Sequence, residues 1–186
     1  MRYAAFNETF EVRLQKTIPY YVKTCSKKYN LDPKMVAALI IVESSGRIGA
    51  RRFEKGFYNR YIKNLRRKDL SGYVPTKITL STEKVDRSFS CGLMQLMGET
   101  ARAHVFEGED MWDLCWPWHN IEIGTRYLRR LYDMDADKTL EELRRTKRFK
   151  AFLSKIPDTE SEKLIRDKLA LLRYNGGAVH EYPYKV

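Results

Sequence analysis

The feature that most constrains this fold is an unbroken apolar run from Met35 to Val42. The run follows Asp32-Pro33, a pair typical of a helix start, because Asp can cap the helix and Pro lacks the N–H that would be unpaired at the first position. A strand is the alternative for so apolar a run. The Met, Ala and Leu residues and the start signal favour a buried helix, which Ser44, Ser45 and Gly46 would end.

Glu43 follows this run without a break. At helical spacing it lies one turn beyond Leu39 and two turns beyond Met35, so its carboxylate extends the buried stripe. Partial burial and the negative end of the helix dipole both disfavour the anion. The position therefore predicts a raised pKa, which suits a carboxylic general acid. The alternative is a Glu turned outward at a frayed helix end.

Composition limits the class of protein. A chain of 186 residues suits a single domain with a real core, and 43% hydrophobic residues exclude a disordered protein. The 35 Lys and Arg residues outnumber 24 Asp and Glu, which gives a formal net charge of +11. This charge indicates a polyanionic neighbourhood: nucleic acid, an anionic membrane or the bacterial wall.

The N-terminus lacks the apolar core of a secretory signal, and no apolar run approaches the length of a membrane span. We therefore expect synthesis in the cytoplasm without a signal peptide and no transmembrane segment. Cys25, Cys91 and Cys115 are odd in number and form no CxxC pair, so free thiols and no metal site are expected. The three histidines have no partners that indicate catalysis.

The remaining pattern predicts mostly helices. Helices are expected over 9–28, with a kink or break at Pro19, and over 57–67 and 99–106. A fourth should span 117–132, where Gly124 would let another helix come close. Residues 71–80 read as a loop or short strand, and 133–157 as a charged helical insertion on the surface. The last helix should open with a Thr159–Glu162 capping box, bury residues 164, 165, 169 and 172, and end at Asn175 before a mobile tail, 178–186.

A short motif, CGLMQLM over residues 91–97, carries two further signals. Gly92 permits a close backbone approach. Gln95 is a polar residue inside an apolar run, and buried amides normally have hydrogen-bond partners.

Four blocks, taken in order, resemble the soluble lytic transglycosylase domain. They are ES (Glu43-Ser44), GLMQLM with TA (Gly92 to Ala101), NIEIGTRYL (Asn120 to Leu128) and ALLRYNGG (Ala170 to Gly177). That family is similar in fold to goose-type lysozyme. The resemblance implies a mainly α, lysozyme-like domain over 1–186, with its core at 31–177. Insertions are expected at about 47–88 and 133–158; the first is basic and separates the catalytic helix from GLMQ. The long segment between Glu43 and Gly92 is similar to the insertion found at this place in some phage and prophage members of the family.

The same resemblance implies a groove for peptidoglycan glycan strands and cleavage of the β-1,4 bond between N-acetylmuramic acid and N-acetylglucosamine. Glu43 would be the single catalytic acid, and Ser44 would help to hold the helix end. Met94 and Gln95 would line the groove. The Tyr174 hydroxyl would orient Glu43, and Asn175 would support the turn after it.

In this reading Glu43 protonates the leaving oxygen and then acts as base on the muramic acid 6-hydroxyl, which closes a 1,6-anhydro ring without metal or cofactor. Asp86, expected in the loop ahead of GLMQ, is a candidate second acid. If it faces Glu43, hydrolysis of the goose-type lysozyme kind becomes the alternative; otherwise it is a loop acid paired with Lys84 or Arg87. Glu54, Glu83 and Glu99 are weaker candidates.

The basic-aromatic stretch at 50–68 leaves a nucleic-acid-binding protein as a distant alternative, although no recognised motif supports it. Its lysines and arginines read as a solvated face, and Arg52-Phe53-Glu54 as the wall of a cleft. The expected partner is peptidoglycan. The protein itself is expected to be a monomer or a part of a virion or secretion assembly. The expected site of action is the periplasm or cell wall.

Overall fold

The computed structural model describes residues 16–104, 106–157, 159–176 and 183, and it divides the chain into two compact units, residues 1–125 and 126–186. The single-domain interpretation stays a prediction. The expected start of the first helix before residue 16 and most of the expected mobile tail lie outside the described residues. The chain is mainly helical over the described ranges, which confirms the predicted fold class.

The central helix of the first unit, α2 (Pro33–Ser44), forms where the sequence predicts it. Asp32 caps it, accepting a hydrogen bond from Lys34 N at 2.8 Å. Its buried residues are Val36, Leu39, Ile40 and Ser44. The helix ends at Ser45, whose backbone is left-handed (φ 54°). The described part of the preceding helix runs over residues 16–28 and continues through Pro19 without a break.

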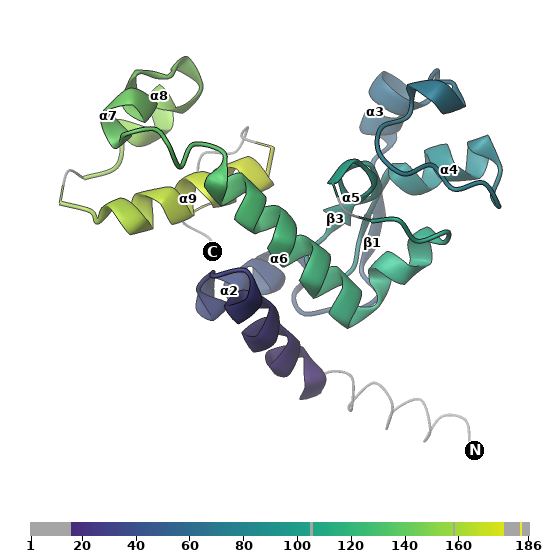
Figure 1. Ribbon diagram of the computed structural model, residues 1–186, viewed down its shortest axis with the longest axis horizontal. Coiled ribbons are helices and arrows are strands. Elements are labelled where there is room, and N and C mark those ends of the chain that lie inside the picture. Colours follow the sequence, from purple (N-terminus) through teal and green to yellow (C-terminus); the bar gives the residue numbers. More distant parts are fainter. Residues whose placement is uncertain (1–15, 105, 158, 177–182, 184–186) are drawn as a thin grey trace. The chain divides into compact units, whose positions relative to one another are not determined.

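A small antiparallel sheet, which the sequence did not predict, follows α2. Its strands are β1 (Arg51–Phe53), β2 (Phe89–Cys91) and β3 (Leu96–Met97), in the spatial order β1-β2-β3. Arg51 pairs with Cys91, and Cys91 pairs with Leu96 on its other side. The turn between β2 and β3 therefore contains Gly92 and Gln95 and has a strand on each side. Strands β1 and β3 of this sheet are labelled in Figure 1.

The long segment between β1 and β2 is folded into short helices rather than one. These are α3 (Lys55–Phe57), the π-helix η1 (Tyr58–Ile62), the 3-10 helix η2 (Arg67–Asp69) and α4 (Leu80–Arg87). The helix predicted over 57–67 is thus shorter than expected, and it ends at Ile62, which is buried. Residues 71–79 form a loop, one of the two predicted alternatives.

The first unit then continues through α5 (Gly98–His104), the 3-10 helix η3 (Met111–Cys115) and α6 (Pro117–Asp133), which runs on into the second unit. α5 and α6 confirm two predicted helices. Gly124 makes room for a methionine, and its expected role of letting another helix come close stays a prediction. A Cβ at Gly124 would lie 2.5 Å from Met94 Sδ.

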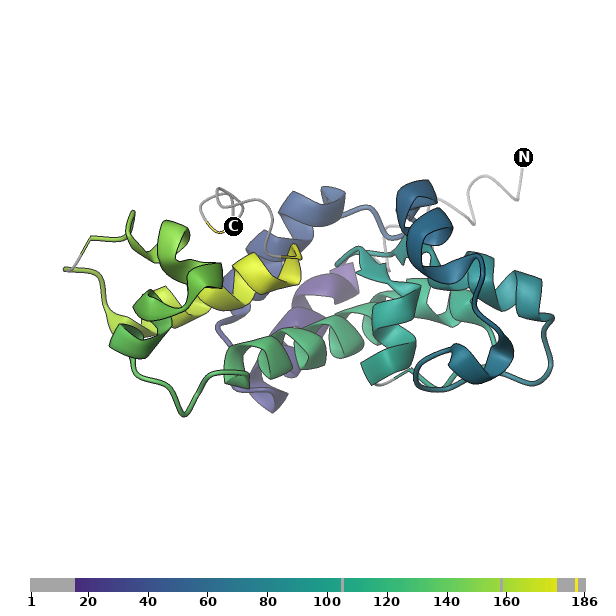
Figure 2. The ribbon, with the colours of Figure 1, turned by 90° about the horizontal axis from the view of Figure 1, so that it is seen from above.

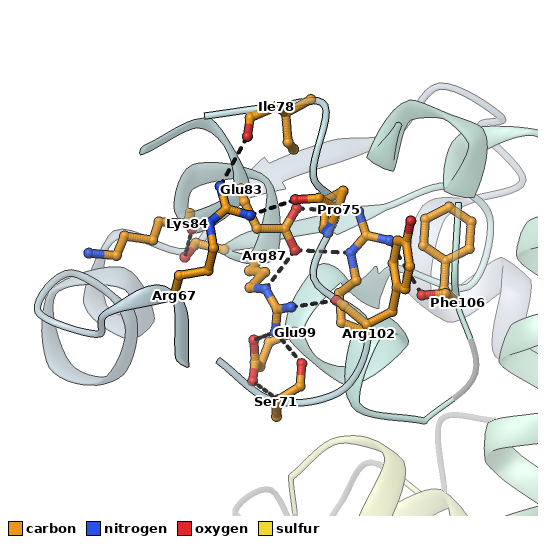
Figure 3. A network of polar contacts seen from close by, with 12 residues as sticks. Arg67, Ser71, Pro75, Ile78, Glu83, Lys84, Arg87, Glu99, Arg102 and Phe106 are labelled. Carbon is orange, nitrogen blue, oxygen red and sulfur yellow. Dashed lines mark hydrogen bonds and ion pairs between the residues drawn. The ribbon is translucent and has the colours of Figure 1, made fainter. Parts of the chain in front are cut away.

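A buried ionic cluster, which we call the Glu83 cluster, joins α4 to α5 (Figure 3). The Glu83 carboxylate accepts hydrogen bonds from Arg87 Nε at 2.7 Å and from Arg102 Nε at 3.0 Å, and all three side chains are fully buried. Arg87 also donates to Glu99 at 2.7 Å and to the carbonyl of Ser71 at 2.8 Å. Glu83 and Glu99, weaker acid candidates in the sequence, therefore have a structural role that ties the loop at Ser71 to two helices.

The second unit contains α7 (Leu140–Arg145), α8 (Lys147–Leu153) and α9 (Glu162–Tyr174), which are grouped together in both ribbon views (Figures 1 and 2). Its core consists of apolar residues from all three helices and from the segment before α9: Leu143, Phe149, Phe152, Leu153, Ile156, Ile165, Leu169 and Leu172. The expected placement of 133–157 on the surface was therefore wrong, because five of these core residues come from it; that the segment is an insertion stays a prediction.

Two details of α9 also differ from the prediction. Ser161, not Thr159, caps the helix by accepting a hydrogen bond from Leu164 N. Leu164 itself is 43% exposed, so it does not belong to the buried stripe that contains Ile165, Leu169 and Leu172.

Candidate active site

A pocket of about 610 Å³ lies in the first unit at the end of α2. Glu43 reaches it from α2 and Gln95 from the turn between β2 and β3. The other lining residues belong to the segment that leads from α2 into β1: Arg47, Gly49, Ala50, Arg51 and Arg52. The structure thus brings together Glu43 of the ES block and Gln95 of the GLMQ block, two predicted site residues that are distant in sequence.

The end of α2 fixes the backbone beside Glu43. The Ser44 hydroxyl, fully within the protein, donates to the carbonyl of Ile40 at 3.0 Å. Arg47 Nε donates to the carbonyl of Ser44 at 3.1 Å, so the carbonyl released at the helix end is paired. Glu43 is partly exposed. These contacts agree with the expectation that Ser44 holds the helix end.

Gln95 is held in an unusual backbone conformation, with φ 45°. Its amide nitrogen donates to the carbonyl of Ala50 at 3.1 Å and to that of Gly92 at 2.9 Å. Because both partners are acceptors, the nitrogen of the amide must face them. The carbonyl oxygen of the side chain is then the atom that Gln95 can offer to a ligand.

Asn120 supports this turn from α6, a role that the sequence analysis missed. Its side chain is fully buried, accepts from Met94 N at 2.7 Å, and donates to the carbonyls of Cys91 and Leu114, both at 2.9 Å. Gly92 meets it closely, since a Cβ there would lie 2.5 Å from Asn120 Nδ2. The signal for this contact was a polar residue between Trp118 and Ile121, at the start of an amphipathic helix.

Met94 was expected to line the groove, but it is not among the residues that line this pocket. Its side chain is fully buried and packs against Gly124. The pocket is lined instead by Gln95, which follows Met94, and by residues that lie well before it in the sequence. The backbone N–H of Met94 is bound by Asn120 and its side chain lies against Gly124 of α6, whereas Gln95, with a left-handed backbone, lines the pocket. Met94 is a supporting core residue.

Asp86 lies in helix α4, not in a loop as predicted. Burial and the nearby Glu83 carboxylate raise the pKa of Asp86, and the guanidinium of Arg51 opposes this shift. The predicted pairing with Arg87 is not formed, since Arg87 is bound to Glu83 and Glu99. Asp86 is not among the residues that line the pocket.

Of the three arginines that line the pocket, Arg52 was expected in a cleft wall, whereas Arg47 and Arg51 were not predicted as site residues. The guanidinium of Arg51 stacks 3.4 Å from the Trp112 ring centroid and 4.4 Å from that of Phe89, which fixes its direction. Arg52 donates to Glu54 at 2.5 Å and keeps a largely exposed side chain. Of the segment Arg52-Phe53-Glu54, expected as a cleft wall, only Arg52 lines the pocket.

Tyr174 and Asn175 belong to the second unit. Within that unit the Tyr174 ring lies 5.6 Å, centroid to centroid, from the ring of Tyr127. Their expected roles, orienting Glu43 and supporting the turn after Tyr174, therefore stay predictions of the resemblance.

Within 16–104, 106–157, 159–176 and 183, no group of three or more His, Cys, Asp or Glu side chains could hold a metal ion. In the same part of the chain, every helix falls short of the length and apolarity needed to cross a membrane.

Comparison with known proteins supplies the family. No curated protein and no solved structure matches the chain. One family model, the transglycosylase SLT domain, matches residues 20–181, which is most of the sequence. The chain therefore belongs to the transglycosylase SLT domain family, whose members are lytic transglycosylases, enzymes that act on peptidoglycan.

Proposed function

We propose that Glu43 is the catalytic residue and cleaves the β-1,4 bond between N-acetylmuramic acid and N-acetylglucosamine. Its protonated carboxyl donates a proton to the glycosidic oxygen as that bond breaks. The resulting carboxylate takes the proton of the muramic acid 6-hydroxyl, whose oxygen attacks the anomeric carbon and forms a 1,6-anhydro ring. The carboxyl is thereby protonated again, so one residue serves as acid and then as base.

The observation that carries this proposal is the shared pocket of Glu43 and Gln95, which come from α2 and from the β2–β3 turn. Among the described residues that line it, Glu43 is the sole acid. Glycosidases that use water generally need a second carboxylate beside the first. A pocket with a single carboxylate supports the intramolecular route, in which the substrate's own hydroxyl replaces water.

The charge of the pocket supports a peptidoglycan substrate. Arg47, Arg51 and Arg52 line the same pocket as Glu43. Muramic acid carries peptide stems with free carboxylates, which a cluster of guanidinium groups attracts. The Gln95 side-chain oxygen can accept a hydrogen bond from an acetamido N–H or a hydroxyl of the glycan.

Replacement of Glu43 tests the proposal. Glu43→Gln keeps the size of the side chain but cannot donate or accept the proton, so clearing of a purified cell-wall suspension should fall by roughly 10²- to 10⁴-fold. Circular dichroism and the melting temperature should match those of the unchanged protein. A well-folded variant that still clears the suspension at the original rate would refute the role of Glu43.

Hydrolysis assisted by Asp86 is the second candidate, and it requires Asp86, which is partly buried in α4 and does not line the pocket, to position a water molecule at the substrate. Mass spectrometry of the released muropeptides separates the two reactions, because anhydro ends lack one water relative to reducing ends.

The long segment between Glu43 and Gly92, which resembles that of phage and prophage members, further leads us to infer a phage or prophage origin.

A further inference from the structure

Two cysteines that are distant in sequence meet beside the pocket. Cys91 ends β2 and is fully buried, whereas Cys115 ends η3 and is partly exposed. Both are free thiols, and their sulfur atoms are within hydrogen-bonding reach of each other. Sulfur atoms in such contact need to approach only a short way to reach the disulfide bond length of about 2.05 Å.

The backbone holds these two segments together independently of the sulfur contact. Asn120 Nδ2 donates to the carbonyl of Cys91 and to the carbonyl of Leu114, the residue before Cys115, both at 2.9 Å. One amide nitrogen therefore binds both chains that carry the thiols. The closeness of the two backbone segments is thus a property of the fold.

The surroundings make the two thiols unequal. The hydrogen bond from Cys91 and the guanidinium of Arg51 lower the pKa of Cys115, while burial opposes this shift. The pKa of Cys91 is raised, because its proton is held in the hydrogen bond to Cys115 and because the thiol is buried. A partly exposed thiol with a lowered pKa is the one that reacts first with an external disulfide.

We propose that Cys91 and Cys115 form a redox-sensitive pair that a low-molecular-weight disulfide, such as oxidised glutathione, converts into an intramolecular disulfide beside the Gly92–Gln95 turn. The pair lies outside the glycan chemistry of Glu43. Cys91 pairs with Arg51 across the sheet and directly precedes Gly92, so the new bond would anchor the turn that carries Gln95 to the start of α6.

The reaction balances as two thiol–disulfide exchanges. The Cys115 thiolate attacks one sulfur of oxidised glutathione, breaks its S–S bond and expels one glutathione thiolate, which takes up the proton lost by Cys115. Cys91 then attacks the Cys115 sulfur of the mixed disulfide and expels the second glutathione, which takes up the proton of Cys91. The two cysteines lose two electrons in total, and one molecule of oxidised glutathione becomes two of reduced glutathione.

The location of the substrate gives the pair a use. Peptidoglycan lies outside the cytoplasm, in compartments where disulfides form and persist, whereas thiols in the cytoplasm stay reduced. A chain synthesised with both thiols reduced would therefore be cross-linked where its substrate is. Closing the loop between residues 91 and 115 restricts the unfolded chain, so the folded oxidised enzyme should be the more heat-resistant form.

Thiol counting in glutathione buffers tests the proposal without an activity assay. After equilibration with excess oxidised glutathione, the full chain should have a mass lower by two hydrogens. Denaturation and alkylation should then label one thiol in place of three, and digestion should yield a peptide joining Cys91 to Cys115. The melting temperature should rise by roughly 5–10 °C. The Cys25→Ser variant should give the same cross-link and the same rise, because Cys25 is buried in the helix over 16–28.

Single replacements distinguish a dithiol from two separate cysteines. Cys91→Ala should stop at a mixed disulfide of Cys115 with glutathione, and Cys115→Ser should leave Cys91 unmodified because it is buried. The proposal is overturned if the unchanged protein keeps all three thiols, accumulates the mixed disulfide, or forms a bond that includes Cys25. Because Glu43→Gln should oxidise like the unchanged protein, this result is independent of the proposed function.

Discussion

At Gly92 the backbone has φ 71°, and a Cβ would lie 2.5 Å from Asn120 Nδ2. Both restrictions act on the residue that begins the turn carrying Gln95. The left-handed conformation disfavours any L side chain, and Asn120 cannot move aside because it also binds Met94 N and the carbonyls of Cys91 and Leu114. The position therefore requires glycine for two separate reasons.

We predict that Gly92→Ala lowers the free energy of unfolding by at least ~2 kcal/mol, since it adds backbone strain and disrupts the buried hydrogen bonds of Asn120. Urea denaturation measures this change. Gly56→Ala is the matched control: Gly56 lies in α3 with no atom within 4 Å of its Cβ position, so the change should be within about 1 kcal/mol and in the stabilising direction. Equal effects of the two replacements would contradict the account of Gly92.

Asp86 gives a prediction about pH. Its folded-state pKa is raised, first by burial and then by Glu83, so the folded protein holds this proton at pH values where the unfolded chain has released it. Stability therefore falls as pH rises from the unfolded pKa through the folded pKa, and the cost is complete above the folded value. Asp86→Asn should remove the cost.

The expected result is that Asp86→Asn is more stable than the unchanged protein at pH 7 and that this advantage shrinks towards pH 4, near the model-compound pKa of about 3.9. Urea denaturation of both proteins at each pH measures it. A variant that is less stable at pH 7, or an advantage that grows on acidification, would show that Asp86 makes a favourable interaction as an anion.

At the scale of elements, the sequence predicted those helices that have both an apolar pattern and a terminal signal. α2 has Asp32 and Pro33 at its start, and α6 has Pro117. The sheet could not be predicted, because strands of two or three residues are too short to show alternation. The same limit applies to η1, whose π-helical turn has no sequence signal of its own.

The candidate site was predictable only in part, for a similar reason. Glu43 and Gln95 were found through short motifs, and one pocket contains both. Arg52 was expected in a cleft wall, but Arg51 was interpreted as part of a solvated face, because its position depends on how β1 pairs with β2, which no local pattern reveals. The role of Asn120 likewise depends on contacts with residues distant in sequence.

The Glu83 cluster provides the prediction for the elements α4 and α5. Glu83→Gln leaves Arg87 and Arg102 fully buried beside a neutral amide, and breaking a buried ion pair costs about 3–5 kcal/mol. The free energy of unfolding should fall by that order in urea denaturation. Glu141→Gln, which breaks an exposed pair with Arg145, should cost no more than about 1 kcal/mol. A small effect at Glu83 would mean that Glu99 and the backbone carbonyls already bound by the two arginines are enough to satisfy both guanidinium groups.

For the whole molecule, the relevant quantity is the net charge of +11. Peptidoglycan carries carboxylates, and a cationic enzyme is attracted to such a polyanion over a distance set by ionic strength. The inactive variant Glu43→Gln allows binding to be measured without cleavage. Charge alone does not distinguish a wall polymer from nucleic acid, so binding to sacculi has to be compared with binding to DNA.

We predict that Glu43→Gln sediments with purified sacculi at low salt and is progressively released as salt shortens the Debye length to about 8 Å and below. Chitin, a neutral glycan, should retain less protein at low salt and show a weaker salt dependence. Retention by duplex DNA but not by sacculi at the same ionic strength would favour the nucleic-acid-binding alternative.

The backbone of Gln95 limits how far this enzyme can be stabilised. With φ 45°, the residue occupies a region that glycine would enter at lower cost, yet glycine would lack the amide that binds Ala50 and Gly92 and faces the pocket. Selection for thermal tolerance at this position should therefore enrich variants that fold better and turn over less substrate. Heat-resistant forms that keep full activity should instead carry their changes elsewhere in the chain.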